Sequence, residues 1–305
     1  MKDGLKQLLH HDSASGVRRI LDSRELSKEA RRLESASARS GIPVFAATDS
    51  KLINVALDTG TLFILGSGAS VLEMSQAQVE QMAQAATVGF GAWALHDFVP
   101  TAYGLSPAKG LVDYERIVSE TMGRPDIVAQ RPEVLFLRPV SALDDALLAS
   151  LPADHRGSTR LYGRFNPFAT AEGALQRDLA LFHRRASTAH GGAIVADAGA
   201  TVVRLLSLAV VHQIPRVVLV GVDMNGSPYF FEQEPSYLAN NNFSRFDTGQ
   251  VTVGSHDTAT LLGRRIPVVD MIRLLATVSS QLHGGRVFVG SKSSTLAKIL
   301  PVFDW

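Results

Sequence analysis

Short apolar runs alternate with segments of helical spacing over most of this chain, from residue 61 to residue 305. The runs are rich in Val, Leu and Phe, which is typical of buried strands: TLFILG at 61–66, EVLFLRP at 133–139, RVVLVGVDM at 216–224 and RVFVGS at 286–291. TRLYGRF at 159–165 is also predicted to be a strand. Helical spacing dominates between the strands, as in SQAQVEQMAQA at 75–85, ALQRDLALFHRRAS at 174–187 and IPVVDMIRLLATVSSQL at 266–282. Further helices are predicted at 111–123, 142–151 and 293–300. This alternation predicts βαβ units, and hence an α/β, Rossmann-like, mostly parallel sheet with helices on both faces.

The first part of the chain, residues 1–58, lacks this alternation. Its leucines have helical spacing, and its Arg and Lys residues alternate with Glu, so we expect a helical N-terminal extension before a nucleotide-binding domain at 59–305. The basic residues favour a solvated helix face over a lid, a dimer arm or a membrane-facing strip; they are Arg18, Arg19, Arg24, Lys28, Arg31 and Arg32.

The composition excludes several classes of protein. A chain of 305 residues with 46% hydrophobic and 19% charged residues should form one large packed domain, with or without an appendage. Its net charge of +1 argues against a dedicated nucleic-acid binder, and the lack of cysteine excludes disulfides and cysteine-bound zinc. No secretory signal or membrane-spanning run stands out. We therefore expect a cytoplasmic protein, at most peripheral at the inner face of the membrane.

The segment 66-GSGAS-70 follows the first predicted strand. Glycines at this place let backbone N–H groups approach an anion, and Ser70 could cap a following helix. The segment matches neither GxGxxG nor the Walker A pattern. From these residues alone, a phosphate site and a plain tight turn are equally good interpretations.

A second group of polar residues ends the strand at 216–220. Asp223 and Asn225 follow Gly221, and a carboxylate at the end of a buried strand needs a partner or a cleft. Asp223 can bind a ligand, or it can cap a turn in which Asn225 and Gly226 are the turn residues. We favour the ligand interpretation because the strand is predicted to be central.

A loop histidine is the best general-base candidate in the chain. His256 lies in VTVGSHDTATL at 251–261, between Ser255 and Asp257, and a histidine in such a loop can accept a proton near neutral pH. His96, beside Asp97, is a weaker candidate. The sequence has no GxSxG, HExxH or CxxC motif, and no metal site is predicted.

Taken in order, these motifs resemble those of a known enzyme family. A strand followed by GSGAS, a strand ending in G-V-D, then NGSPY, a loop His and a last strand followed by S-x-L-A resemble the bacterial sialyltransferases of glycosyltransferase family 42. The order also resembles a wider group of surface-polysaccharide proteins whose first strand is followed by GNGPSL, which includes 6-hydroxymethylpterin pyrophosphokinase-like domains. The resemblance spans residues 61–305.

The resemblance implies a role for individual residues. The catalytic base of the family corresponds to His256, and the tyrosine that assists the departing phosphate corresponds to Tyr229. The residues implied to bind the nucleotide or the substrate are Gly66, Ser67, Gly68, Ser70, Gly91, Gly104, Thr201, Gly221, Asp223 and Asn225. The family usually has Asn where this chain has Ser67, Gly91 and Gly104, and Gly offers a ligand only its backbone.

The implied activity is transfer of a sugar from a nucleotide donor to a bacterial surface glycan, as in lipopolysaccharide or capsule biosynthesis. The expected donor is a CMP-activated acid sugar such as sialic acid, with no metal or other cofactor, and the protein could form a homo-oligomer. Two alternatives stay open. One is pterin pyrophosphokinase-like phosphoryl transfer, which would need Mg²⁺ and convergent carboxylates. The other is a degenerate, non-catalytic family member that binds a nucleotide, which the missing Asn residues favour.

Overall fold

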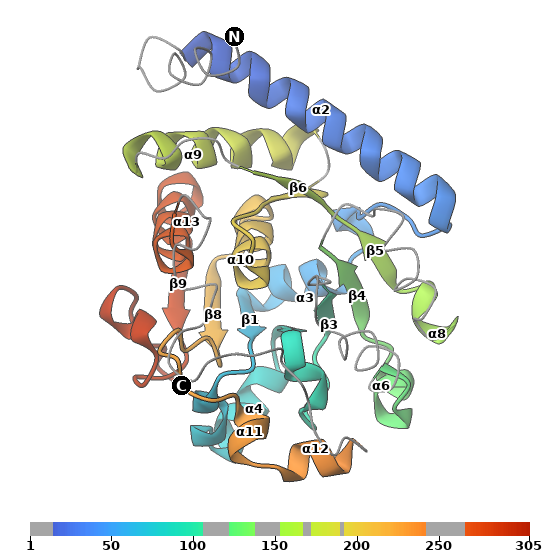
Figure 1. Ribbon diagram of the computed structural model, residues 1–305, viewed down its shortest axis with the longest axis vertical. Coiled ribbons are helices and arrows are strands. Elements are labelled where there is room, and N and C mark those ends of the chain that lie inside the picture. Colours follow the sequence, from blue (N-terminus) through green and yellow to red (C-terminus); the bar gives the residue numbers. More distant parts are fainter. Residues whose placement is uncertain (1–14, 106–121, 138–152, 167–171, 190–191, 242–265) are drawn as a thin grey trace.

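Within the part of the chain that the structure describes, the main sheet has seven strands, all paired in parallel. The computed structural model describes residues 15–105, 122–137, 153–166, 172–189, 192–241 and 266–305. The strands run in the order β5-β4-β3-β2-β1-β8-β9 (Figure 1). They are β1 (Thr61–Leu65), β2 (Ala86–Phe90), β3 (Ala102–Leu105), β4 (Glu133–Phe136), β5 (Thr159–Leu161), β8 (Arg216–Val220) and β9 (Arg286–Val289). The predicted α/β, Rossmann-like class is confirmed.

Helices cover the faces of this sheet because its central strands are buried on both sides. All five residues of β1 are buried, so its apolar run is continuous rather than alternating. α3 (Lys51–Thr59) packs on β1 and β2, and α10 (Thr201–Val211) packs on β1 and β3. α13 (Val268–His283) packs on β9, and α9 (Glu172–Ala189) packs on α10 and α13 (Figure 1).

Short helices complete the described structure. Several of them follow strands directly, as η3 (Ala69–Glu73) follows the turn after β1 and η4 (Gly91–Leu95) follows β2. The others are η2 (Ala47–Asp49), α4 (Gln76–Ala83), α6 (Pro125–Gln130), α8 (Ala153–Arg156), α11 (Phe230–Gln233), α12 (Ser236–Asn240) and η5 (Thr295–Lys298).

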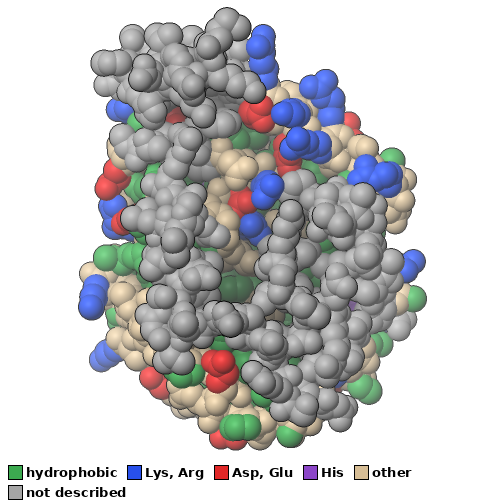
Figure 2. Space-filling view, in the orientation of Figure 1, with side chains coloured by type: hydrophobic (Ala, Val, Ile, Leu, Met, Phe, Trp, Pro, Cys, Tyr) green, Lys and Arg blue, Asp and Glu red, His purple; other side chains and the backbone are tan. Residues whose placement is uncertain are grey.

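The N-terminal region contributes to the same hydrophobic core. α2 (Ser15–Ser40) buries Leu26, Leu33 and Ala36, and Glu29 Oε1 accepts a hydrogen bond from the Arg164 backbone N–H at 2.9 Å. Figure 2 shows Lys and Arg side chains gathered at the upper right, where α2 runs in Figure 1. The division at residue 58 into an extension and a domain stays a prediction.

The segment 159–165, predicted as one strand, is two strands in different sheets. The Tyr162 N–H still donates to Phe136 O in β4 at 2.9 Å, whereas the Gly163 N–H donates to Ala193 O at 2.8 Å. The second strand, β6 (Gly163–Phe165), pairs with β7 (Ile194–Ala196) in a separate two-stranded sheet. The chain changes sheets where α2 packs on it: a Cβ at Gly163 would lie 2.8 Å from Glu29 Cγ.

Of three further helices predicted from the sequence, one is shorter in the structure and two lie wholly or mostly outside the described residues. The closing helix expected around 293–300 is a short 3-10 helix, η5, whose first turn is capped by the Ser294 hydroxyl. The helix predicted at 142–151 lies outside the described residues, as does nearly all of the helix predicted at 111–123.

Candidate functional site at the switch point

The strand order reverses between β1 and β8. After β1 the chain builds β2 to β5 on one side of β1, and it returns later to build β8 and β9 on the other side. In open α/β sheets, ligands bind outside the carboxyl ends of the strands at such a reversal. The candidate site is therefore the edge formed by residues 66–70 after β1 and 221–223 after β8, which we call the switch-point edge.

The two glycine turns of this edge interlock. The Gly66 N–H donates to Val220 O at 2.7 Å, and the Gly68 N–H donates to Gly221 O at 2.8 Å. A Cβ at Gly66 would lie 2.6 Å from Gly221 O, and Gly221 itself has a φ of 64°. Glycine is needed here because the backbones of the two turns touch.

Asp223 is tied into the turn that follows β1. Its side chain is buried, and its two carboxylate oxygens accept hydrogen bonds from Ser70, one from the backbone N–H at 2.9 Å and one from the hydroxyl. A Cβ at Gly68 would overlap the same carboxylate. These contacts are those of a capped tight turn. Ligand binding by Gly66, Gly68, Ser70, Gly221 and Asp223 stays a prediction, with three of the turn's N–H donors already engaged inside the protein.

The other serine of this turn, Ser67, does not take part in the contact with Asp223. Its side chain is largely buried, and its hydroxyl has no hydrogen-bond partner within the part of the chain that the structure describes. It faces Gly91, the first residue after β2, where a Cβ would lie 3.3 Å from Ser67 Oγ and where φ is 61°. A ligand at the switch-point edge can thus use the Ser67 hydroxyl.

Tyr229 lies directly beside the turn after β1. It forms an isolated antiparallel bridge with Gly68, and the next residue, Phe230, donates its N–H to Ser67 O at 3.1 Å. Burial, and then the charge of Glu232, raise the pKa of Tyr229 to about 12. The phenol therefore carries its proton at neutral pH and can donate it to a hydrogen bond. The sequence motif brings Tyr229 to the switch-point edge, although its role in catalysis stays a prediction.

Asn225 is a turn residue. Its Oδ1 accepts the Ser227 N–H at 3.0 Å, and its Nδ2 donates to Ser293 O at 3.4 Å. The loop after β9 joins here as well, since the Thr295 N–H donates to Asp223 O at 2.9 Å. The ends of β1, β8 and β9 are thus bonded together, and ligand binding by Asn225 stays a prediction.

Gly104 and Thr201 lie in other surroundings. Gly104 is inside β3, where a Cβ would lie 3.2 Å from Leu137 and 3.3 Å from Leu205, so close packing accounts for the glycine. Thr201 begins α10, shortly after Asp197 in the sequence, a buried carboxylate that no sequence motif indicated. Asp197 pairs with Arg204 at 2.9 Å and with Arg164 at 3.3 Å. Ligand binding at both positions stays a prediction.

Of the two histidine candidates, the structure describes His96 but not His256. His256 lies in 242–265, outside the described residues. His96 directly follows η4 at the carboxyl end of β2, and its ring stacks between Trp93 at 4.5 Å and Tyr237 at 5.3 Å. The ring of Phe230, which follows Tyr229, meets it edge-on at 5.6 Å. His96 is therefore one aromatic contact away from the turn after β1.

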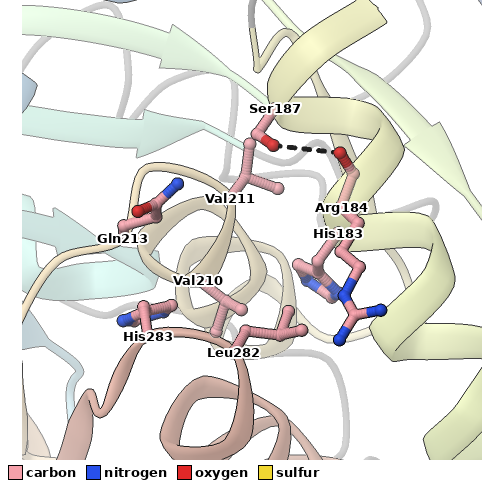
Figure 3. Close-up of a pocket in the computed structure, with 8 residues that line it drawn as sticks. All are labelled: His183, Arg184, Ser187, Val210, Val211, Gln213, Leu282 and His283. Carbon is pink, nitrogen blue, oxygen red and sulfur yellow. Dashed lines mark hydrogen bonds between the residues drawn. The ribbon is translucent and has the colours of Figure 1, made fainter.

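A pocket of about 150 Å³ lies elsewhere, between α9, α10 and α13 (Figure 3). Gln213 and His283 line it, and they shortly precede β8 and β9, so it lies at the opposite end of these strands from the switch-point edge. His183, also in its lining, donates from Nδ1 to Leu179 O at 2.6 Å and accepts from the Ser207 hydroxyl at 3.0 Å. Both nitrogens of His183 are engaged, which indicates a structural role.

Within the described residues, no three His, Asp or Glu side chains lie together in a way that could hold a metal ion. Metal-independent activity stays a prediction. Among the helices that the structure describes, none is long and apolar enough to cross a membrane.

Comparison with known proteins finds similarity at the level of structure. No protein-family model matches the chain, and no curated protein matches its sequence. The structure is similar to the crystal structure of the monofunctional alpha-2,3-sialyltransferase Cst-I from Campylobacter jejuni, with a TM-score of 0.43 and 11% identity over 80% of each chain.

Proposed function

We propose that this protein is a nucleotide-sugar-dependent glycosyltransferase whose donor binds at the switch-point edge. One observation supports this most. Residues from three separate sequence segments, Ser67, Gly91 and Tyr229, lie around the point where the strand order reverses. The motif order links Ser67 and Gly91 to donor binding and Tyr229 to the departing phosphate, and the Ser67 hydroxyl makes no hydrogen bond within the described residues.

The proposed reaction uses two side chains, one that accepts a proton and one that donates a hydrogen bond. His256 takes the proton from an acceptor hydroxyl while that oxygen attacks the anomeric carbon of the donor sugar. The bond between the anomeric carbon and the donor phosphate breaks, and the nucleotide monophosphate leaves with the electron pair. Tyr229 donates a hydrogen bond to the departing phosphate, because the phenol carries its proton at neutral pH.

The donor we propose is a CMP-activated acid sugar such as sialic acid, and the acceptor is a bacterial surface glycan. A donor with a single phosphate leaves less charge to neutralise than a diphosphate, so the reaction is expected to proceed without a metal ion. We further propose a cytoplasmic location, peripheral to the inner face of the membrane, and a homo-oligomer is compatible with this function.

The test of this function is nucleotide binding followed by transfer. We expect CMP, but not GDP or ATP, to stabilise the protein, because a ligand at 100 times its Kd adds about 2.7 kcal/mol to the free energy of unfolding. For a chain of this size that raises Tm by roughly 4 °C in a thermal-shift experiment. No shift with millimolar CMP, UMP, GDP or ATP would contradict the proposal, whereas transfer that requires Mg²⁺ and stops in EDTA would favour the pyrophosphokinase-like alternative.

Two serines of the same turn offer a matched pair of variants. Ser70→Ala removes a donor from the buried Asp223 carboxylate and should lower stability by about 1–3 kcal/mol. Ser67→Ala removes a hydroxyl that has no partner in the described residues, so it should change stability by less than about 0.5 kcal/mol.

For CMP affinity we expect the opposite ranking of the two variants, with the larger loss in Ser67→Ala. Loss of a hydrogen bond to a charged phosphate costs about 1.5–3 kcal/mol, so Ser67→Ala should weaken CMP binding roughly tenfold to a hundredfold. Urea unfolding and calorimetric titration measure the two effects separately. Wild-type CMP affinity in Ser67→Ala would remove this hydroxyl from the site.

A further inference from the structure

The imidazole of His96 is held in one tautomer. The Phe98 backbone N–H donates to His96 Nδ1 at 2.9 Å, so this nitrogen uses its lone pair, and in the neutral ring the proton sits on Nε2. Burial lowers the pKa of His96 to about 4, Asp97 acts in the opposite direction, and Arg124 lowers it further. The ring is therefore neutral at physiological pH, with Nε2–H as its one donor.

That donor has no partner inside the described part of the protein. Within the residues that the structure describes, His96 Nε2 makes no hydrogen bond. It is also not among the fully enclosed nitrogens that lack a partner, a group that includes His155 Nδ1 and His212 Nε2. The N–H is therefore accessible from outside, while the rest of the ring is packed between aromatic side chains.

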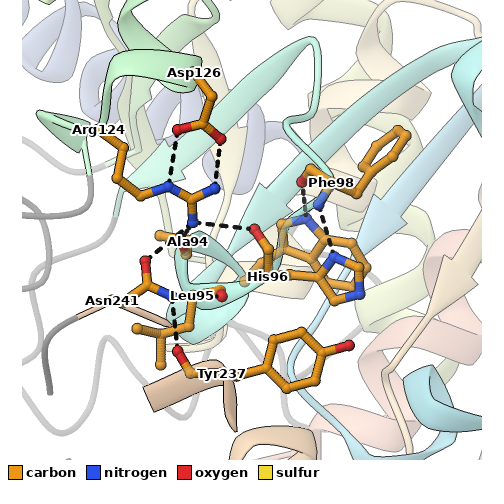
Figure 4. Close-up of polar contacts among 9 residues, drawn as sticks. Ala94, Leu95, His96, Phe98, Arg124, Asp126, Tyr237 and Asn241 are labelled. Atoms are coloured by element: carbon orange, nitrogen blue, oxygen red, sulfur yellow. Dashed lines mark hydrogen bonds and ion pairs between the residues drawn. The ribbon is translucent and has the colours of Figure 1, made fainter. Parts of the chain in front are cut away.

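The backbone around His96 is clamped by a polar network that joins three segments (Figure 4). Arg124 Nη1 donates to Ala94 O and His96 O at 3.4 Å and to Asn241 Oδ1 at 3.0 Å, and its guanidinium also pairs with Asp126 through two nitrogens. Asn241 Nδ2 in turn donates to Leu95 O at 2.9 Å. Such a network holds a ring in a fixed direction, beyond what stacking alone provides.

The same residues connect His96 to the switch-point edge. Trp93 Nε1 donates to Phe98 O at 3.2 Å, which closes the turn that carries the histidine. Phe230 touches the His96 ring with its own ring and donates its N–H to Ser67 O. One end of this unit thus holds the imidazole and the other holds the turn that carries the Ser67 hydroxyl.

We propose that His96 Nε2–H donates a hydrogen bond to a phosphate oxygen of the nucleotide bound at the switch-point edge. The inference rests on the proposed function and adds to it a residue for which the sequence offered only a weak signal. With Nδ1 engaged, the ring can only donate, and it pairs best with a group that can only accept, as a phosphate oxygen does. A neutral imidazole keeps its proton in this role, so His96 binds and orients the phosphate while proton transfer falls to another residue.

The test compares three variants with CMP as the probe. His96→Phe preserves the aromatic stacking but removes the Nε2–H donor, and with it the Nδ1 acceptor of the Phe98 N–H, and we expect CMP affinity to fall at least tenfold. His96→Gln keeps an N–H donor and should recover part of that loss. His283→Phe is the matched control, because it replaces a half-buried histidine at the opposite end of the strands and should leave the affinity unchanged.

A spectroscopic readout separates ligand contact from a purely structural role. In ¹⁵N-histidine spectra of the wild type at pH 7, we expect His96 protonated at Nε2 and a shift of that resonance as CMP is added. Protonation at Nδ1, or wild-type CMP affinity in His96→Phe, would overturn the inference and leave the proposed function standing. Absence of any nucleotide binding by the wild type would overturn both.

Discussion

Replacing Gly221 with alanine should destabilise the protein by about 3 kcal/mol or more and abolish nucleotide binding. Gly221 has a φ of 64°, in the left-handed region that costs other residues about 1–2 kcal/mol. The added Cβ would also overlap Gly66 O and lie 2.6 Å from Val71 Cγ2. Because the obstructing oxygen belongs to the backbone of the neighbouring turn, the two turns must separate, and that opens the switch-point edge.

The variant Gly60→Ala separates the backbone strain from the steric overlap of the added Cβ. Gly60 has a φ of 65° and ends α3, but nothing lies within 4 Å of the position that a Cβ would occupy there. This variant therefore has the backbone strain without the overlap and should lose about 1–2 kcal/mol. Urea unfolding of both variants measures the difference. Equal losses would mean that the contact between the turns is not rigid, and would remove the structural reason for Gly221.

The sequence predicts the sheet well because its central strands are long apolar runs. β1 and β8 are recognisable from TLFIL and RVVLV alone, and burial on both faces explains why neither run alternates. β7 has three residues in a glycine-rich segment and pairs only with β6 in the described structure, so it carries no periodic pattern that could be recognised. The change of sheet at Tyr162 and Gly163 depends on α2, a helix far away in sequence.

At the candidate site, too, the sequence predicts features that depend on neighbouring residues and misses those that depend on residues far away in the chain. The sequence places glycines, Asp223 and Tyr229 after strands, which is enough to predict that they lie at one edge. It cannot tell whether Asp223 faces a ligand or caps a turn, because its partner Ser70 is 153 residues away. The same limit applies to His96, whose importance depends on Arg124 and Asn241 from two other segments.

Three largely buried histidines predict a steep loss of stability in mild acid, because their pKa values are strongly lowered in the folded protein. Burial is the largest cause that lowers the pKa of His96, His183 and His212 to about 4, from an ordinary value of 6.5. Between these two pH values the unfolded chain binds protons at these residues and the folded protein does not. Stability is therefore complete above pH 6.5 and falls as the pH decreases towards 4.

The expected size of this effect is large compared with the stability of a typical domain. Each histidine contributes about 1.4 kcal/mol per pH unit, so three give a slope of about 4 kcal/mol per unit within the window. Over the whole window this amounts to roughly 3 kcal/mol for each residue, against a usual total of about 5–15 kcal/mol. We expect the protein to unfold before pH 4 is reached, as measured by urea unfolding at a series of pH values.

The variant His212→Gln tests whether buried histidines cause this dependence of stability on pH. His212 Nε2 is enclosed and has no partner in the described structure, while a backbone hydrogen bond with Gly192 acts against the lowering of the pKa of this ring. Glutamine removes the titrating group and keeps a side chain that can form hydrogen bonds. The variant should be less stable at pH 7.5, since the contact with the Phe45 ring is lost, but its slope between pH 6.5 and 4.5 should fall by about a third. The Asp126 carboxylate does not produce this result, because the hydrogen bond from Arg124 lowers its pKa and its contribution is lost only below its ordinary value of 3.8. A stability that stays constant from pH 7 to pH 4.5 would show that these histidines accept protons without unfolding, because water reaches their rings in the folded protein.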